Sequence, residues 1–168
     1  TDIMNLGQQG GFQGQTTTTE DDTASQKGIK ADGAITITGG TFVTDTVDDS
    51  IHSNSDILIT SGQFDLRTGD DGINSAGGTD SSGFGGARPG QEQFASSSGS
   101  FITINGGDFV IVSTGDCVDS NGTLTINNGT LDLTCNGSGN TAIDCDGTYT
   151  NNGGDVTTND GSENNLGQ

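Results

Sequence analysis

Basic residues, proline, tryptophan and long apolar runs are scarce or missing in this chain of 168 residues. Four Lys and Arg residues stand against 23 Asp and Glu residues, which gives a formal net charge of -19. That charge would repel the phosphates of nucleic acid and of an anionic membrane surface. No apolar run reaches the length of a membrane span, and no charged-then-apolar signal segment opens the chain. We therefore expect a mature or excised piece of a soluble protein, one domain in size, with no nucleic-acid partner and no membrane insertion.

The hydrophobic fraction of 27% and the charged fraction of 16% are low, which at first sight is typical of disorder. Thirty glycines with a single proline point instead to a regular chain. A repeat of about 22 residues runs through it, because Gly39-Gly40-Thr41-Phe42 aligns with Ser61-Gly62-Gln63-Phe64. The same pattern returns at Gly106-Gly107-Asp108-Phe109, Asn128-Gly129-Thr130-Leu131 and Gly153-Gly154-Asp155-Val156.

Each repeat carries three short apolar stretches, and equivalent residues form three columns. The first column contains Ile29, Ile51, Ile73, Val118 and Ile143. The second contains the pairs Ile35/Ile37, Ile57/Ile59, Ile102/Ile104, Leu124/Ile126 and Tyr149/Asn151. The third contains Phe42, Phe64, Phe109, Leu131 and Val156.

Apolar and polar residues alternate within these stretches, which is typical of strands with one buried face. Three short strands per repeat, separated by Gly, Asn and Asp turns, predict an all-β fold: a right-handed parallel β-helix (β-solenoid) of about five coils with a shared axial core. We expect this β-helix over residues 27–158. Residues 1–26 are predicted to be an N-terminal strand and an acidic linker that complete a coil, and residues 159–168 to begin a sixth coil.

The third coil is interrupted by an excursion over residues 79–101 that is rich in Gly and Ser. Two interpretations stay open for it. It is either a lip that contacts a glycan through Phe84, Arg88 and Phe94, or a tolerated surface insertion. The absence of Trp and the single Tyr argue against a glycan site, because sugar-binding faces usually present aromatic platforms.

The repeats Asp48-Asp49-Ser50-Ile51-His52-Ser53, Asp70-Asp71-Gly72-Ile73-Asn74-Ser75 and Ile102-Thr103-Ile104-Asn105-Gly106-Gly107 resemble the bacterial extracellular carbohydrate-binding β-helix domains. The resemblance covers about Lys27 to Thr158, and the chain departs from that family in having only five recognisable coils. It implies a pectate-lyase-like fold, an extracellular location, calcium binding and an association with plant cell-wall polysaccharides.

Acidic residues stack just before the first apolar column, as Gln26-Lys27, Asp48-Asp49, Asp70-Asp71, Gly115-Asp116 and Asn140-Thr141. Two carboxylates one strand spacing apart repel by about 3 kcal/mol at an effective dielectric near 20. A calcium ion, which binds carboxylate and carbonyl oxygens, would compensate that repulsion. The predicted Ca²⁺ ligands are Asp48, Asp49, Asp70, Asp71 and Asp116, with Asp119 and Asp144 as further candidates in another column. Lys27 caps the ladder and is able to neutralise one carboxylate. The alternative is that these side chains are simply solvated.

Catalysis fits the sequence poorly. A pectate lyase needs a basic side chain beside its calcium-bound substrate, and the basic residues here are Lys27, Lys30, Arg67, Arg88 and His52. Nothing in the sequence places a pair of them beside the acidic ladder or marks a partner for His52. The three cysteines, Cys117, Cys135 and Cys145, fall in different columns and are expected to be small buried thiols. We therefore expect a protein that is not an enzyme.

The two ends of the chain match each other in register. Neither end carries the pattern of an amphipathic capping helix, although a β-helix has two open ends. If residue 168 of one copy preceded residue 1 of the next, Ile3, Met4, Leu6, Phe12 and Leu166 would form one shared coil. The alternative is that both partial coils fray or fold back. The sequence thus favours a structural subunit that polymerises head to tail with itself, with a calcium-dependent polysaccharide-binding module as the second interpretation.

Overall fold

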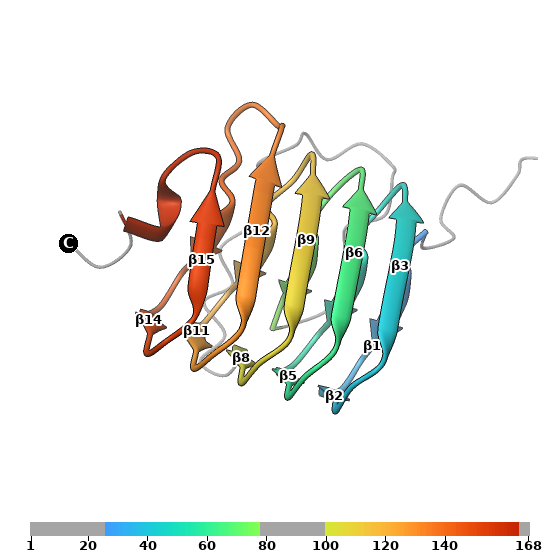
Figure 1. Ribbon diagram of the computed structural model, residues 1–168. Helices are drawn as coiled ribbons and strands as arrows, with labels where there is room; N and C mark the ends of the chain where they lie inside the picture. The colour runs from blue at the N-terminus through green and yellow to red at the C-terminus, as the bar shows by residue number, and fades with distance from the viewer. Residues whose placement is uncertain (1–25, 78–99, 165–168) are drawn as a thin grey trace, which may run out of the picture.

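A computed structural model describes residues 26–77 and 100–164. These residues form a parallel β-solenoid of about five coils with three strands per coil, which confirms the predicted fold class. The coils lie side by side along one axis, and Figure 1 shows the longest strand of each coil in the order β3, β6, β9, β12 and β15. No helix among the described residues is long and apolar enough to cross a membrane.

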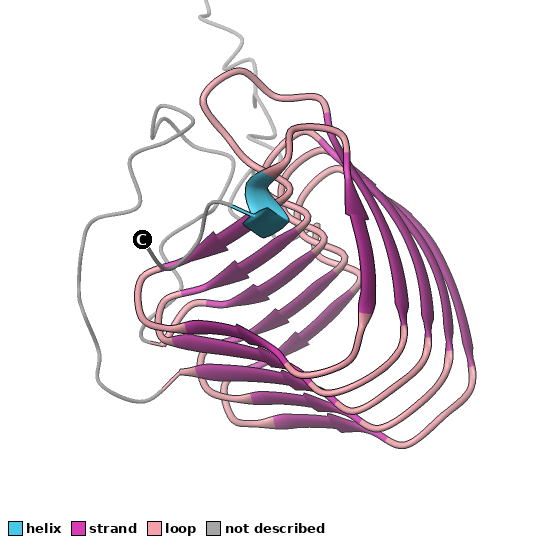
Figure 2. Ribbon diagram, turned by 60° about the vertical axis from the view of Figure 1, so that its left-hand side comes forward, coloured by secondary structure: helices cyan, strands magenta, loops and turns pink. Residues whose placement is uncertain are grey.

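Three five-stranded parallel sheets run the length of the stack and surround a common interior (Figure 2). The first sheet consists of β1 (Ile29–Ala31), β4 (Ile51–Ser53), β7 (Ile73–Ser75), β10 (Val118–Ser120) and β13 (Ile143–Cys145). The second consists of β2 (Ile35–Ile37), β5 (Ile57–Ile59), β8 (Phe101–Ile104), β11 (Thr123–Ile126) and β14 (Tyr149–Asn151). The third consists of β3 (Thr41–Thr46), β6 (Gln63–Thr68), β9 (Asp108–Ser113), β12 (Thr130–Cys135) and β15 (Asp155–Thr158).

The predicted columns are the core. In the strand register Ile29 lies beside Ile51 and Ile51 beside Ile73, so like residues stack on like residues. In the third sheet Phe64 stacks between Phe42 and Phe109, with ring centroids 4.9 and 4.4 Å apart and the rings nearly parallel. Such offset aromatic stacking adds to the free energy gained from burial. The axial core that the alternation predicted is therefore present.

The described strands on either side of the excursion belong to one continuous solenoid. The chain leaves after β7, and β8 returns beside β5 with Ile102 next to Ile57 and Ile104 next to Ile59. In the first sheet, the strands before and after the excursion are also direct neighbours, because β10 pairs with β7. The insertion is therefore compatible with an unbroken stack of coils.

A single 3₁₀ turn, Ser162–Asn164, follows β15 and packs against β13 and β15. Elsewhere the N–H of a first-column residue donates to the next coil, as Ile51 does to the carbonyl of Gly72 at 3.0 Å. At the last coil the Ile143 N–H donates to Ser162 Oγ at 3.1 Å, and the Ala142 N–H donates to Asp160 Oδ2 at 2.8 Å. Side chains thus accept, at the end of the first sheet, the hydrogen bonds that backbone carbonyls accept between the other coils.

Candidate functional site

Carboxylates link successive coils at the turn that precedes the first sheet. Asp49 Oδ1 accepts a hydrogen bond from the backbone N–H of Asp71 at 3.1 Å, and Asp71 Oδ1 accepts one from the N–H of Asp116 at 2.7 Å. Asp116 Oδ1 in turn accepts one from the N–H of Thr141. Each carboxylate is therefore bonded to the main chain of the following coil, and such charge-assisted hydrogen bonds favour acidic residues at these stacked positions.

At the N-terminal end of this ladder, buried basic side chains pair with the carboxylates. Lys27 Nζ donates to Asp48 Oδ1 at 2.7 Å and to Asp49 Oδ2 at 2.8 Å, and the Lys27 side chain is 0% exposed. His52 Nδ1 lies 2.7 Å from the same Asp49 oxygen. Burial works against the charge on Asp49, but the hydrogen bonds from His52 and Lys27 outweigh it and lower the Asp49 pKa. This end of the ladder is an ion-paired cluster.

Further along the ladder, carboxylates are surrounded by other carboxylates. Burial, followed by the charge of Asp49, raises the pKa of Asp71 well above its usual value. Burial also raises the pKa of Asp116 to about 6, with Asp144 adding to the shift and the hydrogen bond from Thr141 opposing it. Among the ion pairs between described residues, none involves Asp116 or Asp144. The two halves of one ladder thus differ in their electrostatic surroundings.

Among the described residues, two groups of three acidic side chains are compact enough to hold a metal ion. In each group, one carboxylate oxygen per residue lies within 4.8 Å of the others; the groups are Asp48, Asp49 and Asp70, and Asp116, Asp119 and Asp144. The structure therefore brings together three of the five predicted ligands, places Asp116 with the two further candidates, and leaves Asp71 outside both described groups. All-oxygen donor sets of this kind suit Ca²⁺.

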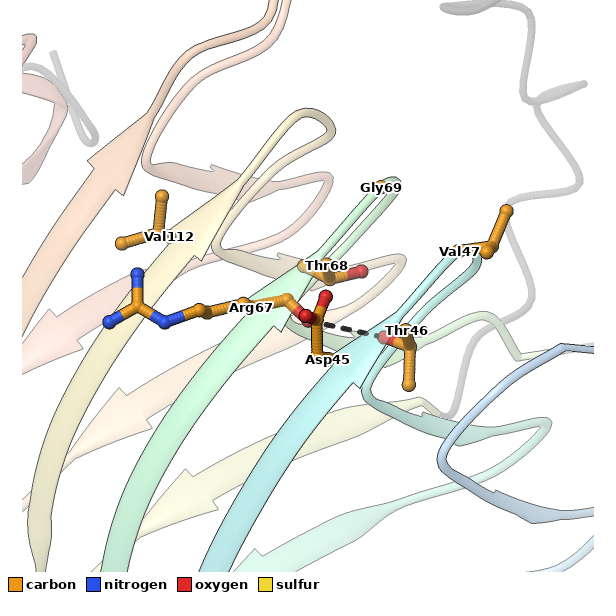
Figure 3. Close-up of a pocket in the computed structure, with 7 residues that line it drawn as sticks. All are labelled: Asp45, Thr46, Val47, Arg67, Thr68, Gly69 and Val112. Atoms are coloured by element: carbon orange, nitrogen blue, oxygen red, sulfur yellow. Dashed lines mark hydrogen bonds between the residues drawn. The ribbon is translucent and has the colours of Figure 1, made fainter.

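A pocket of about 530 Å³ opens on the third sheet where β3 and β6 end (Figure 3). It is lined by Asp45, Thr46, Val47, Arg67, Thr68, Gly69 and Val112. The Arg67 guanidinium lies 3.4 Å from Asp65 Oδ1, and the Arg67 side chain is 55% exposed. Below the side chains, the Thr46 hydroxyl donates to the Arg67 carbonyl at 3.4 Å. The sequence did not mark this pocket, because Asp45, Arg67 and Val112 are outward-facing members of strands recognised only by their buried members, and Val47 and Gly69 lie in the turns that follow two of those strands.

An exposed aromatic ring lies on the outer face of the second sheet. Phe101 is 45% exposed and stands beside Thr123 in the strand register. Its N–H donates to Asp56 Oδ1 at 3.0 Å. The sequence analysis counted Phe101 as the end of the excursion and so overlooked it. The alternation of Phe101-Ile102-Thr103-Ile104 was the signal that could have placed it in a strand, facing outward.

Other predicted site residues lie outside the described residues. These are the glycan candidates Phe84, Arg88 and Phe94, and the junction residues Ile3, Met4, Leu6, Phe12 and Leu166. Their roles remain predictions.

Two basic side chains, the expected Lys27 and also His52, lie beside the acidic ladder, and both are buried. Lys27 and His52 share Asp49, and their side chains are 0% and 1% exposed. A buried, ion-paired lysine and histidine have no access to a polysaccharide. Their arrangement supports the folded state and offers no exposed general base.

The cysteines are free thiols, as expected. Cys117 and Cys135 are buried and Cys145 is half-buried. Burial raises the pKa of the Cys117 thiol to about 12, although its contact with Ser113 Oγ at 3.1 Å opposes the shift. Such thiols are poor nucleophiles at neutral pH.

Comparison with known proteins gives one likeness. Residues 3–72 match the family model of the carbohydrate-binding domain-containing proteins. No curated protein and no solved structure matches the chain. The matched stretch supports carbohydrate binding, and its described part extends from the start of the solenoid to the turn before β7.

Proposed function

We propose that this chain is a non-enzymatic, extracellular carbohydrate-binding module whose glycan occupies the Arg67 pocket. The observation that carries this proposal is that the pocket lies almost entirely within the stretch that matches the carbohydrate-binding family model. Every lining residue except Val112 lies within the matched residues 3–72.

The chemistry of the pocket suits a sugar. A pyranose offers hydroxyl groups around its rim and apolar C–H groups on its faces, so its site needs polar and apolar groups together. Asp45 supplies acceptors, Arg67 supplies donors, and Val47, which is 57% exposed, supplies apolar surface. The guanidinium is also able to pair bidentately with the carboxylate of an acidic plant cell-wall sugar. In a chain of net charge -19 an exposed arginine is a distinctive contact for such a glycan.

The test is binding to a panel of neutral and acidic plant cell-wall polysaccharides, measured by affinity electrophoresis and calorimetry. Arg67→Gln should weaken binding at least about tenfold, as expected when a charged hydrogen-bond donor is lost. Lys30→Gln is the matched control, because Lys30 is an exposed cation in β1 of the first sheet. Binding by Arg67→Gln at wild-type strength would contradict this site. Loss only in the double variant Phe84→Ala/Phe94→Ala would move the site to the excursion.

A second candidate function, a filament subunit, is favoured by the open geometry of the solenoid. Among the described residues, β1, β2 and β3 at one end and β13, β14 and β15 at the other each pair with a single neighbouring strand. Asp160 and Ser162 accept hydrogen bonds from the N–H groups of Ala142 and Ile143, at the start of the last strand of the first sheet. A second copy that adds parallel strands at these edges would extend the stack head to tail.

Light scattering and electron microscopy test this assembly. Uniform filaments that disappear when residues 1–12 are deleted would support the predicted junction at Ile3, Met4, Leu6, Phe12 and Leu166. A wild-type chain that stays monomeric at high concentration would exclude the filament and leave the carbohydrate-binding proposal untouched.

The proposed carbohydrate-binding module also binds Ca²⁺. The acidic groups on the ladder provide oxygen ligands for the ion next to the first sheet. A Ca²⁺ ion held there would tie neighbouring coils together and stabilise the folded module.

A further inference from the structure

We propose that Asn128 is a site of spontaneous covalent modification, in which its side-chain amide becomes a carboxylate through a cyclic imide formed with the backbone nitrogen of Gly129. This chemistry needs neither a glycan nor a metal ion. Asn128 is one of five asparagines that glycine follows in the sequence, and its surroundings differ from those of the other four, which are Asn105, Asn121, Asn136 and Asn152.

The two groups that would react already contact each other. The Gly129 N–H donates to Asn128 Oδ1 at 2.9 Å, so the Gly129 nitrogen lies beside the side-chain carbonyl that it attacks. The same hydrogen bond polarises that carbonyl. Glycine has no Cβ, so no side chain on residue 129 crowds its nitrogen. Reacting groups held in contact in this way react faster than groups that must first find each other.

The side chain of Asn128 is exposed and lies between two glycines of the neighbouring coils. By continuation of the strand register, Gly106 lies beside Asn128 in the preceding coil and Gly153 in the following coil. Neither glycine has a side chain that holds the Asn128 amide in another position. The imide therefore has room to form, and solvent water reaches it.

Three of the other asparagines have one of their two reacting groups bonded elsewhere. Asn105 and Asn152 belong to a ladder of amides across coils, because Asn127 donates to Asn105 Oδ1 at 2.7 Å and Asn152 donates to Asn127 Oδ1 at 2.7 Å. In the loop after β12, the Gly137 N–H donates to the Cys135 sulfur and so faces away from the asparagine before it. These contacts oppose closure of the imide ring.

Asn121 is the closest match to Asn128, because Asn121-Gly122-Thr123 and Asn128-Gly129-Thr130 have the same sequence. Asn121 Nδ2 donates to the Ala76 carbonyl at 2.6 Å, and the Gly122 N–H donates to Ser120 Oγ at 3.3 Å. The amide is thus tied to another coil, and the nitrogen that would attack it faces a different side chain. The chain therefore contains its own control: one tripeptide in two surroundings.

The reaction balances with water as its only co-reactant. The Gly129 nitrogen gives its proton to hydroxide or a buffer base and bonds to Cγ of Asn128, and the amide nitrogen leaves as ammonia. Water then opens the imide at one of its two carbonyls. The product is aspartate, or isoaspartate if the main chain now runs through the side-chain carbonyl.

Isoaspartate lengthens the main chain just before two bonds between coils. The Thr130 N–H donates to the Gly107 carbonyl at 2.9 Å, and the Asp155 N–H donates to the Gly129 carbonyl at 2.8 Å. A longer main chain at residue 128 shifts both partners out of register. We therefore expect the isoaspartate product to weaken the pairing of β12 with β9 and β15.

For the test, the full folded chain is incubated in mildly alkaline buffer, and each Asn-Gly site is followed by peptide mass spectrometry, with enzymatic detection of isoaspartate as a second readout. Asn128 should react at least about tenfold faster than Asn121. In denaturant the two identical tripeptides should react at similar rates, because the folded contacts are lost. Equal rates at the two sites in the folded chain, a faster reaction at any of the other four, or no product at Asn128 would each overturn the proposal.

Asn128→Gln is the matched variant, because it keeps an exposed amide but needs a larger ring to react. It should form no product at residue 128 and unfold at the wild-type temperature. Asn128→Asp carries the aspartate product on a normal main chain and should also unfold at that temperature, whereas the aged wild type should unfold at a lower one. An aged wild type that contains isoaspartate and unfolds normally would contradict the predicted effect on the coils.

Discussion

His52 donates from Nδ1 to Asp49 Oδ2 over 2.7 Å, and its other ring nitrogen lies 2.9 Å from the side-chain oxygen of Asn54. Asn54 is held in this orientation because its nitrogen donates to Asp32 Oδ1 at 3.3 Å. Both ring nitrogens therefore face acceptors, an arrangement that favours the doubly protonated, charged ring. Burial opposes the resulting charge, but the hydrogen bonds to Asp49 and Asn54 outweigh it and raise the His52 pKa.

The first prediction concerns pH. A raised pKa in the folded state means that the stabilisation by His52 is fully present below its unfolded pKa of about 6.5 and is lost as the pH rises through the higher folded value. In the presence of chelator, thermal unfolding should thus show a loss of about 1–3 kcal/mol above pH 6.5 that is absent from His52→Asn. Asparagine is the natural counterpart, since Asn74 donates to Asp71 in the same way. A variant with the same pH profile as the wild type would show that His52 is neutral in the fold.

The core columns and the acidic ladder were predictable from the sequence, whereas the contacts of this network were not. The columns of Ile51, Phe64 and their equivalents were predictable, because burial on one face imposes alternation and stacking imposes a fixed period. The ladder was also visible as stacked Asp pairs. The cap by Lys27 was expected as well, but the contacts of His52 with Asp49 and of Asn74 with Asp71 were not, because they depend on which side-chain atoms meet within the folded turn.

The Arg67 pocket and the exposed Phe101 were not predicted from the sequence, for a related reason. Arg67 and Val112 lie far apart in the sequence and converge only because β6 and β9 pair in register. Their outward-facing positions carry no periodic constraint, so neither residue type is demanded by the fold. Phe101 was overlooked because the return from the excursion could not be placed to the residue.

The second prediction concerns Lys27. Lys27→Met leaves Asp48 and Asp49 buried without their ammonium partner, so the free energy of unfolding in chelator should fall by about 3–5 kcal/mol. Lys30→Met, at an exposed position three residues away, should change it by less than about 0.5 kcal/mol. Chemical denaturation measures both. Equal effects of the two substitutions would contradict a special role for Lys27.

The same variant opens the acidic group to a metal. With Nζ removed, the oxygens of Asp48, Asp49 and Asp70 remain within 4.8 Å of one another, so Lys27→Met should bind one more Ca²⁺ than the wild type. Calorimetric stoichiometry measures this directly. An unchanged stoichiometry would mean that the ammonium does not occupy a cation site.

The third prediction concerns the glycines that precede the third sheet. Gly40, Gly62, Gly107 and Gly129 all have positive φ, and a Cβ at Gly62 would lie 2.8 Å from the Phe64 ring and 3.2 Å from the Gly40 carbonyl. Gly62→Ala should therefore cost about 1–3 kcal/mol of stability. Gly33→Ala is the control, because a Cβ there meets no atom within 4 Å. Similar unfolding midpoints for the two variants would show that the turn adapts.

The last prediction separates the aromatic core from the aromatic surface. Phe64 is 3% exposed and stacked on both faces, so Phe64→Ala removes two ring contacts and leaves a cavity between coils. We expect a loss of about 3–5 kcal/mol in the free energy of unfolding. Phe101→Ala, on the outer face of the second sheet and 45% exposed, should cost less than about 1 kcal/mol. If Phe101→Ala instead weakens polysaccharide binding while Arg67→Gln does not, the glycan lies on the second sheet and the Arg67 pocket is not its site.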